Sequence, residues 1–338
     1  MKALVCRAWG TVDDLKLEEV PPPTPGRGQL LIDVRATGVN YADSIMVAGK
    51  YQTRPPFPFS PGLETSGVVA SCGEGVTRFK AGERVMAILA HGGFAEQALA
   101  DEAETFAIPG AMPFDEAGAF PIAYLSSDVA LRWQGRLERG ETLLVLGAAG
   151  GVGLTAVEIG KAMGARVIAA ASTPEKLAVA RERGADDTIN YATEKLTERV
   201  MALTNDKGAD VCFDPVGGDL FDAALSSLGW GGRILLIGFV GGIPSIPANR
   251  LLVKHRAALG SSLRYFRWHA ADKLERSVDA LLGWYKEGKL KPLVTHRLPL
   301  ERGAEAIRLL TDRKAHGKVV VMPAGATTPA SSPAAPCP

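Results

Sequence analysis

Residues 142–153, TLLVLGAAGGVG, join an apolar run to a glycine-rich turn. The run 142–146 is typical of a buried strand, and residues 154–164 are typical of a helix that ends at a glycine. A strand, a glycine-rich turn and a helix form the setting of a dinucleotide-binding fingerprint. Gly150 and Gly153 lack side chains where backbone must approach a pyrophosphate, and the helix N-terminus offers N–H groups and a positive dipole.

The fingerprint departs from its usual form at one position. Ala148 stands where G-x-G-x-x-G has its first glycine. The alternative interpretation is an ordinary glycine-rich connection. The strands expected on both sides of the turn favour the fingerprint.

Composition limits the classes of function. The chain has 338 residues, of which 46% are hydrophobic, and this length suggests two domains. A net charge of +1 gives no reason to expect nucleic acid or an anionic membrane as the main partner. The four cysteines are far apart and form no C-x-x-C pair, which fits a reducing cytoplasm and argues against a disulfide framework. No apolar run is long enough to span a membrane.

The first part of the chain, residues 1–120, is rich in short strands, proline and glycine. Residues 30–39 are strand-like, and residues 59–70 indicate a turn that leads into a strand. Between them, the segment 40–51 is typical of a short helix that ends at Gly49. Many short strands with tight turns predict a small β-barrel.

From about residue 121 strands and helices alternate. The predicted strands are 142–146, 166–171, 187–189, 209–213, 233–237 and 257–260. Six strands with crossover helices predict a doubly wound parallel sheet of the Rossmann type. A helix at 272–287 and two short strands follow. The tail, 323–338, contains mainly Pro, Ala, Ser and Thr and is predicted to be disordered.

Several motifs in this order resemble the medium-chain dehydrogenase/reductase superfamily, and its zinc-independent quinone oxidoreductase branch most closely. They are GVN at 38–40, PGLE at 61–64, GERV at 82–85, GGFAE at 92–96, AAGGVG at 148–153, NY at 190–191 and GKVV at 317–320. The resemblance implies a GroES-like catalytic domain over 1–120, a Rossmann NADPH-binding domain over 121–262, and a return to the catalytic domain over 263–322. It also implies a cofactor held between the two domains.

The zinc ligands of related alcohol dehydrogenases are replaced. Asn40 stands where those relatives have a cysteine, and Leu63 stands where they have a histidine. Their four-cysteine lobe is missing as well. Because zinc prefers thiolate and imidazole, Glu64 alone does not hold it. We predict no metal, and we interpret Glu64 as a structural acceptor or a relict.

The residues after the second strand of the sheet predict NADPH rather than NADH. An NAD site has a carboxylate about twenty positions after the fingerprint, whereas this chain has Ser172 and Thr173 there, followed by Lys176. The resemblance assigns the 2′-phosphate to Lys176 and Tyr191. The alternative interpretation is that Ser172 or Thr173 caps a helix and Lys176 is merely solvated.

The resemblance also implies the other contacts of the cofactor. Its predicted ligands are Ala149, Gly150, Gly151, Val152 and Gly153 at the turn, Gly238, Phe239, Val240, Ser261, Ser262 and Leu263 after the last two strands, and Lys318. Asn40 is expected near the nicotinamide ribose or ring.

Quinones and conjugated enones accept hydride without a metal because the charge delocalises onto oxygen, which must then be protonated. Tyr51 is the candidate proton donor, by similarity to enoyl-thioester reductases. The alternative is that it only forms part of the pocket wall. Ile45, Arg264 and Tyr265 complete the expected substrate pocket. The segment 264–268 equally suits a domain-packing cluster.

Three functions remain open at this stage. The first is an NADPH-dependent reductase of a small-molecule quinone or enone. The second is an enoyl-thioester reductase, with Lys254, Arg264 and Arg267 as a basic patch for phosphates. The third is a non-enzymatic NADPH-binding protein. The resemblance further predicts a homodimer formed through the last strand of the sheet, which otherwise has an unpaired edge.

Overall fold

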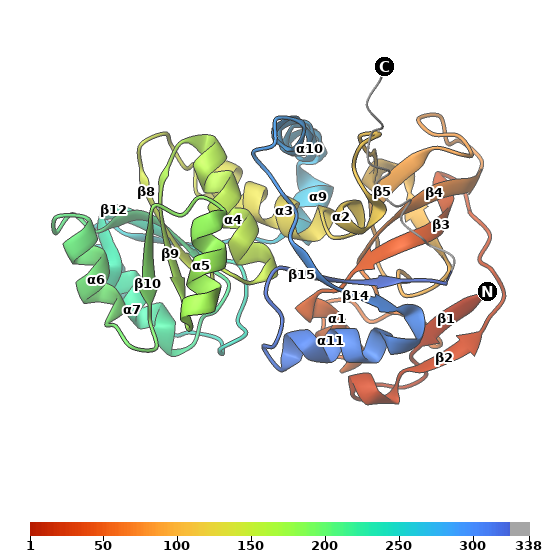
Figure 1. The fold of residues 1–338 in the computed structure, drawn as a ribbon, viewed down its shortest axis with the longest axis horizontal. Coiled ribbons are helices and arrows are strands. Elements are labelled where there is room, and N and C mark those ends of the chain that lie inside the picture. The colour runs from red at the N-terminus through yellow and green to blue at the C-terminus, as the bar shows by residue number, and fades with distance from the viewer. Residues whose placement is uncertain (325–338) are drawn as a thin grey trace, which may run out of the picture. The chain divides into compact units, whose positions relative to one another are not determined.

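The computed structural model describes residues 1–324. The predicted disorder of the tail therefore lies outside the described residues, apart from Pro323 and Ala324. The chain divides into two compact units (Figure 1). Unit 1 comprises Met1–Pro121, His296–Lys314 and the chain from Val319, and unit 2 comprises Ile122–Thr295 and Ala315–Lys318.

Unit 2 contains a six-stranded parallel sheet in the order β10-β9-β8-β11-β12-β13. The strands are β8 (Thr142–Leu146), β9 (Arg166–Ala171), β10 (Asp187–Asn190), β11 (Ala209–Asp214), β12 (Leu228–Leu236) and β13 (Ala257–Gly260). The order reverses between β8 and β11, as in a doubly wound nucleotide-binding fold. The predicted Rossmann sheet is confirmed.

Five helices connect these strands: α4 (Gly151–Met163), α5 (Pro174–Glu182), α6 (Leu196–Leu203), α7 (Asp219–Ser227) and α8 (Ala248–Leu252). Helix α3 (Pro121–Asp128) and the π-helical turn η3 (Val129–Gln134) precede β8, and α9 (Leu263–His269) and α10 (Ala271–Lys286) follow β13. Helices α4 and α5 pack against β9, and α6 and α7 pack against each other (Figure 1). Helix α4 ends where the sequence predicts, at Gly164, whose φ is 88°.

The sheet of unit 2 is buried on both faces, which explains why its strands are almost continuously apolar. Leu144, Ile168, Ile189 and Cys212 belong to one core cluster and are fully buried. This burial fixes the sheet, and the sheet in turn fixes the loops at the carboxyl ends of its strands.

Unit 1 is built on antiparallel strands. A two-stranded sheet pairs β1 (Lys2–Val5) with β2 (Lys16–Glu19). A seven-stranded sheet has the order β14-β15-β3-β4-β5-β7, with β6 on β3. Its strands are β3 (Gln29–Gly38), β4 (Glu64–Cys72), β5 (Arg84–Ile88), β6 (Gln97–Asp101), β7 (Thr105–Ala107), β14 (Val294–Pro299) and β15 (Lys318–Met322). This is the predicted GroES-like sheet domain.

Short helices border this sheet. They are α1 (Tyr41–Val47), α2 (Phe114–Gly118), α11 (Gly303–Thr311) and the 3₁₀ turns η1 (Val12–Asp14), η2 (Glu102–Glu104) and η4 (Leu300–Arg302). Helix α1 contacts α11, and α2 packs against β3 and β4. Helix α2 packs on β3, and α1 begins just after β3 ends. The packing of α2 therefore helps to fix the start of α1, where residues of the candidate site lie.

Candidate functional site

The glycine-rich turn follows β8 in a conformation that explains the alanine in its motif. Gly147 has a φ of 57°, which glycine adopts at little cost. Its carbonyl oxygen accepts a hydrogen bond from the N–H of Gly150 at 2.9 Å. The sharp turn is thus made one residue earlier than in the usual fingerprint, and Ala148 needs no special backbone angle. The sequence signal was the extra glycine before Ala148.

The start of α4 lies close against this turn. A Cβ atom on Gly153 would lie 2.2 Å from the carbonyl oxygen of Gly147, so no side chain fits there. A Cβ atom on Gly151 would lie 3.2 Å from Cδ of Lys318, which is buried. The first N–H groups of α4 have no partners within the helix. Together with the helix dipole they form a suitable site for a pyrophosphate.

The loops after β9 and β10 lie side by side, because these strands pair in parallel and the N–H of Tyr191 donates to the carbonyl of Ala171 at 3.1 Å. Thr173 is the N-cap of α5, and its hydroxyl accepts a hydrogen bond from the N–H of Lys176 at 3.3 Å. The capping interpretation of Thr173 is therefore confirmed.

Capping by Thr173 leaves the half-buried Lys176 side chain available. Its ammonium group forms no ion pair or hydrogen bond within residues 1–324. No carboxylate occupies positions 171–174. A lysine in the first turn of α5 whose ammonium group is not held by an ion pair in that range suits a phosphate better than a bare ribose.

The loops after β12 and β13 are joined to each other. The N–H of Ser261 donates to the carbonyl of Leu236 at 3.1 Å. Phe239 and Val240 are exposed, whereas Leu263 is buried at the start of α9. All six residues predicted here lie beyond the carboxyl ends of neighbouring strands, which is the edge where ligands bind in such sheets.

Asp214, at the carboxyl end of β11, is a residue that the sequence analysis missed. Its Oδ1 accepts hydrogen bonds from the N–H groups of Val216 and Gly217, each at 2.8 Å. Its Oδ2 is buried and has no hydrogen-bond partner among the described residues. Burial raises the pKa of this carboxyl, and the two N–H bonds lower it. Asp214 shapes the loop beside the point where the strand order reverses. The sequence signal was DPVGG at 214–218.

Helix α4 itself carries a buried carboxyl group, that of Glu158. Glu158 accepts a hydrogen bond from the Tyr124 hydroxyl at 2.6 Å and pairs with Arg183 at 3.2 Å. Burial raises the pKa of Glu158 to about 7, against the opposing effects of these partners. It joins α3, α4 and the residue after α5, and so helps to hold the helix that carries the fingerprint.

Unit 1 holds Asn40 at the N-terminus of α1. Its side-chain amide donates to Oε1 of the fully buried Glu64 at 2.9 Å. Its backbone N–H donates to Oδ2 of Asp43 at 2.7 Å, and Oδ1 of Asp43 accepts from the N–H of Gly62 at 3.2 Å. Two buried carboxylates therefore fix the position of Asn40. The interpretation of Glu64 as a structural acceptor agrees with this geometry.

The other predicted substrate residues belong to different elements. Ile45 lies in α1, and Tyr51 follows that helix; both are half-buried and both belong to unit 1. Arg264 and Tyr265 lie in α9 of unit 2, where each contacts Trp268, at 5.1 Å and 5.7 Å to the ring centroid. The segment that the sequence left as a pocket wall or a packing cluster is thus helical.

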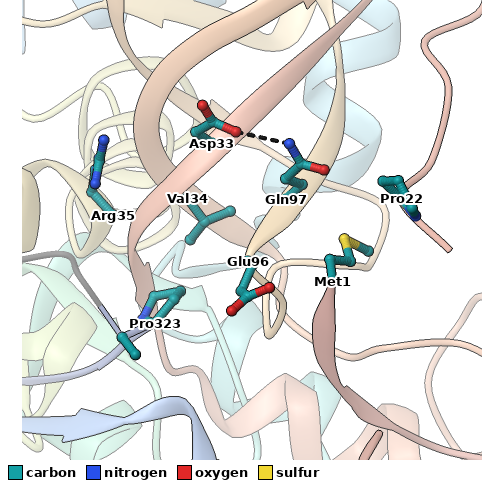
Figure 2. A pocket seen from close by; sticks show the side chains of 9 residues that line it. Met1, Pro22, Asp33, Val34, Arg35, Glu96, Gln97 and Pro323 are labelled. Atoms are coloured by element: carbon teal, nitrogen blue, oxygen red, sulfur yellow. Dashed lines mark hydrogen bonds between the residues drawn. The ribbon is translucent and has the colours of Figure 1, made fainter. Parts of the chain in front are cut away.

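An open hollow of about 440 Å³ lies in unit 1 (Figure 2). It is lined by Met1, Pro22, Asp33, Val34, Arg35, Glu96, Gln97, Pro323 and Ala324. Gln97 of β6 donates to Asp33, its partner on the neighbouring strand β3, at 2.9 Å (Figure 2). Its lining includes none of the predicted cofactor or substrate residues, so we do not assign the candidate site to it.

Within residues 1–324 no three histidine, cysteine, aspartate or glutamate side chains are arranged to hold a metal ion. None of the helices in that range is both long and apolar enough to cross a membrane.

Comparison with known families gives two matches. The model of the alcohol dehydrogenase GroES-like domain matches residues 26–110, and that of the zinc-binding dehydrogenases matches residues 151–278. Together they cover more than half of the chain.

Individual relatives match over nearly the whole chain. Quinone oxidoreductase-like protein 2 homolog of Nematostella vectensis is 39% identical over 300 residues, which are 88% of this chain and 82% of that protein. The quinone oxidoreductase of Thermus thermophilus, solved also with NADPH, has a TM-score of 0.84 at 34% identity and covers 95% of this chain and all of its own. The quinone oxidoreductase of Escherichia coli with NADPH has a TM-score of 0.90 at 27% identity, covering 96% of this chain and all of its own.

Proposed function

The chain belongs to the quinone oxidoreductase branch of the medium-chain dehydrogenase/reductase superfamily, and from this premise we propose that it is an NADPH-dependent reductase. It transfers hydride to a quinone or an α,β-unsaturated carbonyl without a metal. The observation that carries the cofactor assignment is Lys176, in the first turn of α5, whose ammonium group forms no ion pair within residues 1–324 and which follows a strand end without a carboxylate at positions 171–174. NADPH in the Thermus thermophilus and Escherichia coli structures supports the same choice.

Each region of the chain has a separate task in this proposal. The turn and helix start at residues 149–153 hold the pyrophosphate, through the backbone N–H groups that the turn itself does not use and with Lys318 beside them. Lys176, Tyr191 and Ser172 hold the 2′-phosphate. The loops at 238–240 and 261–263 hold the nicotinamide end. The bound nicotinamide supplies the hydride, and the protein supplies placement and electrostatics.

The residues at the positions of the zinc ligands, Asn40 and Leu63, support a reaction without a metal. Asn40 offers an amide that is already bonded to Glu64, and Leu63 is a buried aliphatic side chain. Neither is a ligand that zinc prefers. Elemental analysis of the purified protein tests this point. Near-stoichiometric zinc, with activity lost on chelation, would contradict it.

One experiment separates the three functions considered from the sequence. NADPH oxidation is followed with a panel of quinones, a panel of enones and crotonyl-CoA, and KM is measured for NADPH and NADH. We expect turnover with quinones or enones and a lower KM for NADPH. Turnover confined to crotonyl-CoA would favour the thioester reductase. Tight NADPH binding without turnover on any acceptor would favour a non-enzymatic role.

The basic patch required by the thioester reductase is weakened by the structure. Arg267 is 9% exposed, so its guanidinium is poorly placed to meet phosphates in solvent. Lys254 is exposed, and Arg264 lies over the ring of Trp268. Reduction of a small quinone or enone therefore remains the better-supported proposal.

A further inference from the structure

Asp214 ends β11 and fixes the β11 loop, residues 215–218, that follows it. Asp214 is 1% exposed, and its Oδ1 accepts hydrogen bonds from the N–H groups of Val216 and Gly217, each at 2.8 Å. Gly217 and Gly218 both have a positive φ, 65° and 56°. Because glycine adopts such angles at little cost and has many others open to it, the loop needs contacts that hold it. The carboxyl group of Asp214 supplies two of them.

The β11 loop is bonded to the β12 segment, residues 238–242. The N–H of Gly241 donates to the carbonyl oxygen of Val216 at 2.8 Å. The N–H of Gly218 donates to the carbonyl oxygen of Gly242, also at 2.8 Å. A Cβ atom on Gly218 would lie 2.3 Å from the carbonyl oxygen of Gly241, so the two backbones are in direct contact. A shift of the loop therefore moves the β12 segment, where three of the predicted cofactor residues lie.

The β11 loop also faces the glycine-rich turn after β8. A Cβ atom on Gly147 would lie 3.2 Å from Cγ2 of Val216 and 3.7 Å from Cγ of Pro215. Strand β11 pairs with β8 on one side and with β12 on the other, which places its loop between the loops of those two strands. The β11 loop thus meets both the turn that we propose for the pyrophosphate and the segment that we propose for the nicotinamide end.

We infer that Asp214 is a positioning residue, which holds the β12 segment in place for the cofactor through its two hydrogen bonds to the β11 loop. This inference rests on the proposed NADPH binding, and all the residues concerned belong to unit 2. Both bonds end on one oxygen, which a neutral amide also possesses, whereas the buried Oδ2 has no hydrogen-bond partner within residues 1–324. The effect therefore comes from the position of that oxygen and not from the charge, and it needs no contact between Asp214 and the cofactor.

Two variants of Asp214 separate the hydrogen bonds from the charge. Asp214→Asn keeps an oxygen for both N–H groups, and its NH₂ group takes the place of Oδ2, where a partner is already lacking. Asp214→Ala removes the acceptor altogether. Asp210→Ala is the matched control near the other end of β11, where Oδ2 of Asp210 accepts a hydrogen bond from the N–H of Thr142 at 2.7 Å.

Hydrogen exchange of the cofactor-free protein gives a measurement that does not depend on activity. In Asp214→Ala the N–H groups of Gly218 and Gly241 should exchange about ten-fold or more faster, because the loop that they join has lost its bonds to the carboxyl group. Exchange in β10, at the far edge of the sheet, should not change. NADPH affinity, measured by fluorescence titration, should fall by about ten-fold or more. In Asp214→Asn both quantities should stay within about three-fold of the wild type, and Asp210→Ala should change neither.

The outcomes are distinct. Faster exchange and weaker NADPH binding in Asp214→Ala, both restored in Asp214→Asn, support the inference. Asp214→Ala with wild-type NADPH affinity would overturn it, because the cofactor would then not depend on the loop. Asp214→Asn as impaired as Asp214→Ala would overturn it too, since the charge would then matter. Exchange that rises equally in β10 would indicate a general loss of stability and would count against it.

The inference and the proposed function can fail separately. A wild-type protein that does not bind NADPH would refute the proposed function, and hydrogen exchange alone would then decide whether Asp214 holds the β12 segment. Thermal melting shows whether Asp214→Ala is folded. If it is not, Asp214→Ser takes its place, because a serine hydroxyl makes the same kind of bond more weakly. Its NADPH affinity should lie about three-fold or more below that of Asp214→Asn, and equal affinities would overturn the inference.

Discussion

Replacing Lys176 by alanine removes the cation that we assign to the 2′-phosphate. A charge-assisted hydrogen bond contributes about 1.5–3 kcal/mol, so KM for NADPH should rise roughly ten-fold or more while KM for NADH changes little. Lys195→Ala is the matched control, since its ammonium already pairs with Glu198 at 2.8 Å. Equal changes for both cofactors in Lys176→Ala would refute the assignment.

Tyr51→Phe tests the proton donor. A quinone gives a stabilised hydroquinone anion that water can protonate, whereas an enone gives a more basic enolate. Help from a general acid is worth about 10²–10⁴-fold where no other donor exists. We therefore expect kcat/KM to fall more for enones than for quinones, at unchanged NADPH affinity. If both activities stay within about two-fold of wild type, Tyr51 is only part of the pocket wall.

At the scale of elements, the contact between α4 and the turn before it tolerates no side chain at position 153. Gly153→Ala places a Cβ atom 2.2 Å from the backbone oxygen of Gly147, so the helix must move away from β8. NADPH affinity should fall by about ten-fold or more, and the melting temperature should drop. Both quantities are measured on the same sample.

Gly283 in α10 provides the control for this substitution. A Cβ atom there meets nothing within 4 Å. Gly283→Ala should leave NADPH affinity unchanged and raise stability by about 0.5–1 kcal/mol, because alanine is the better helix former. Normal NADPH binding by Gly153→Ala would show that the close contact is not needed.

Glu158 makes the stability of the helices around α4 depend on pH. Its folded-state pKa of about 7 lies above the ordinary value of 4.5. The folded state therefore binds the proton more tightly than the unfolded state does. The contribution of this bound proton to the free energy of unfolding is lost as pH rises from about 4.5 through 7. Relative to Glu158→Gln, the wild-type protein should lose up to about 3 kcal/mol of unfolding free energy between pH 5 and pH 8. Denaturant unfolding at both pH values measures this, and an unchanged difference would refute the raised pKa.

The sheet of unit 2 could be predicted from sequence because its strands are apolar runs bounded by glycine-rich turns, and burial on both faces requires such runs. Helix α11 was not predicted, because the sequence analysis assigned only short strands near it. Helix α9 was missed since its aromatic and basic residues suggested a pocket wall. Both helices are short and depend on tertiary packing.

The candidate site could be predicted only where its chemistry is local. Gly153 and Lys176 stand at fixed offsets from a recognisable turn. The contact between Asn40 and Glu64 joins residues 24 positions apart, and only the pairing of strands brings them together. The burial of Oδ2 of Asp214 without a hydrogen-bond partner among the described residues likewise depends on the conformation of the loop after β11, which the sequence alone does not give.

At the scale of the whole molecule, we propose a homodimer formed through β13. This strand is the last of its sheet and pairs only with β12 among the described strands. Near its start three apolar side chains are strongly exposed, Trp230 at 76%, Leu252 at 77% and Val253 at 73%. An exposed edge strand next to apolar surface is a favourable place for a second copy.

Light scattering at micromolar concentration measures the mass, and we expect that of a dimer. Leu252→Asp should shift it toward a monomer, because a charge would have to be buried. Leu17→Asp in β2, at a side chain that is 37% exposed, should leave the mass unchanged. A monomeric mass for the wild-type protein would contradict the proposal.

The close packing at Gly38 has a consequence for how this family can change over evolutionary time. An alanine at that position would meet both the carboxylate of Glu64 and the backbone of Gly118. Loss of Glu64 in a relative relieves only the first of these contacts. Homologues without the glutamate should therefore still keep glycine at the equivalent of position 38, whereas a homologue with alanine there must also have moved its counterpart of α2. Substitution at position 38 is thus restricted first by the backbone of Gly118 and only second by the side chain at position 64.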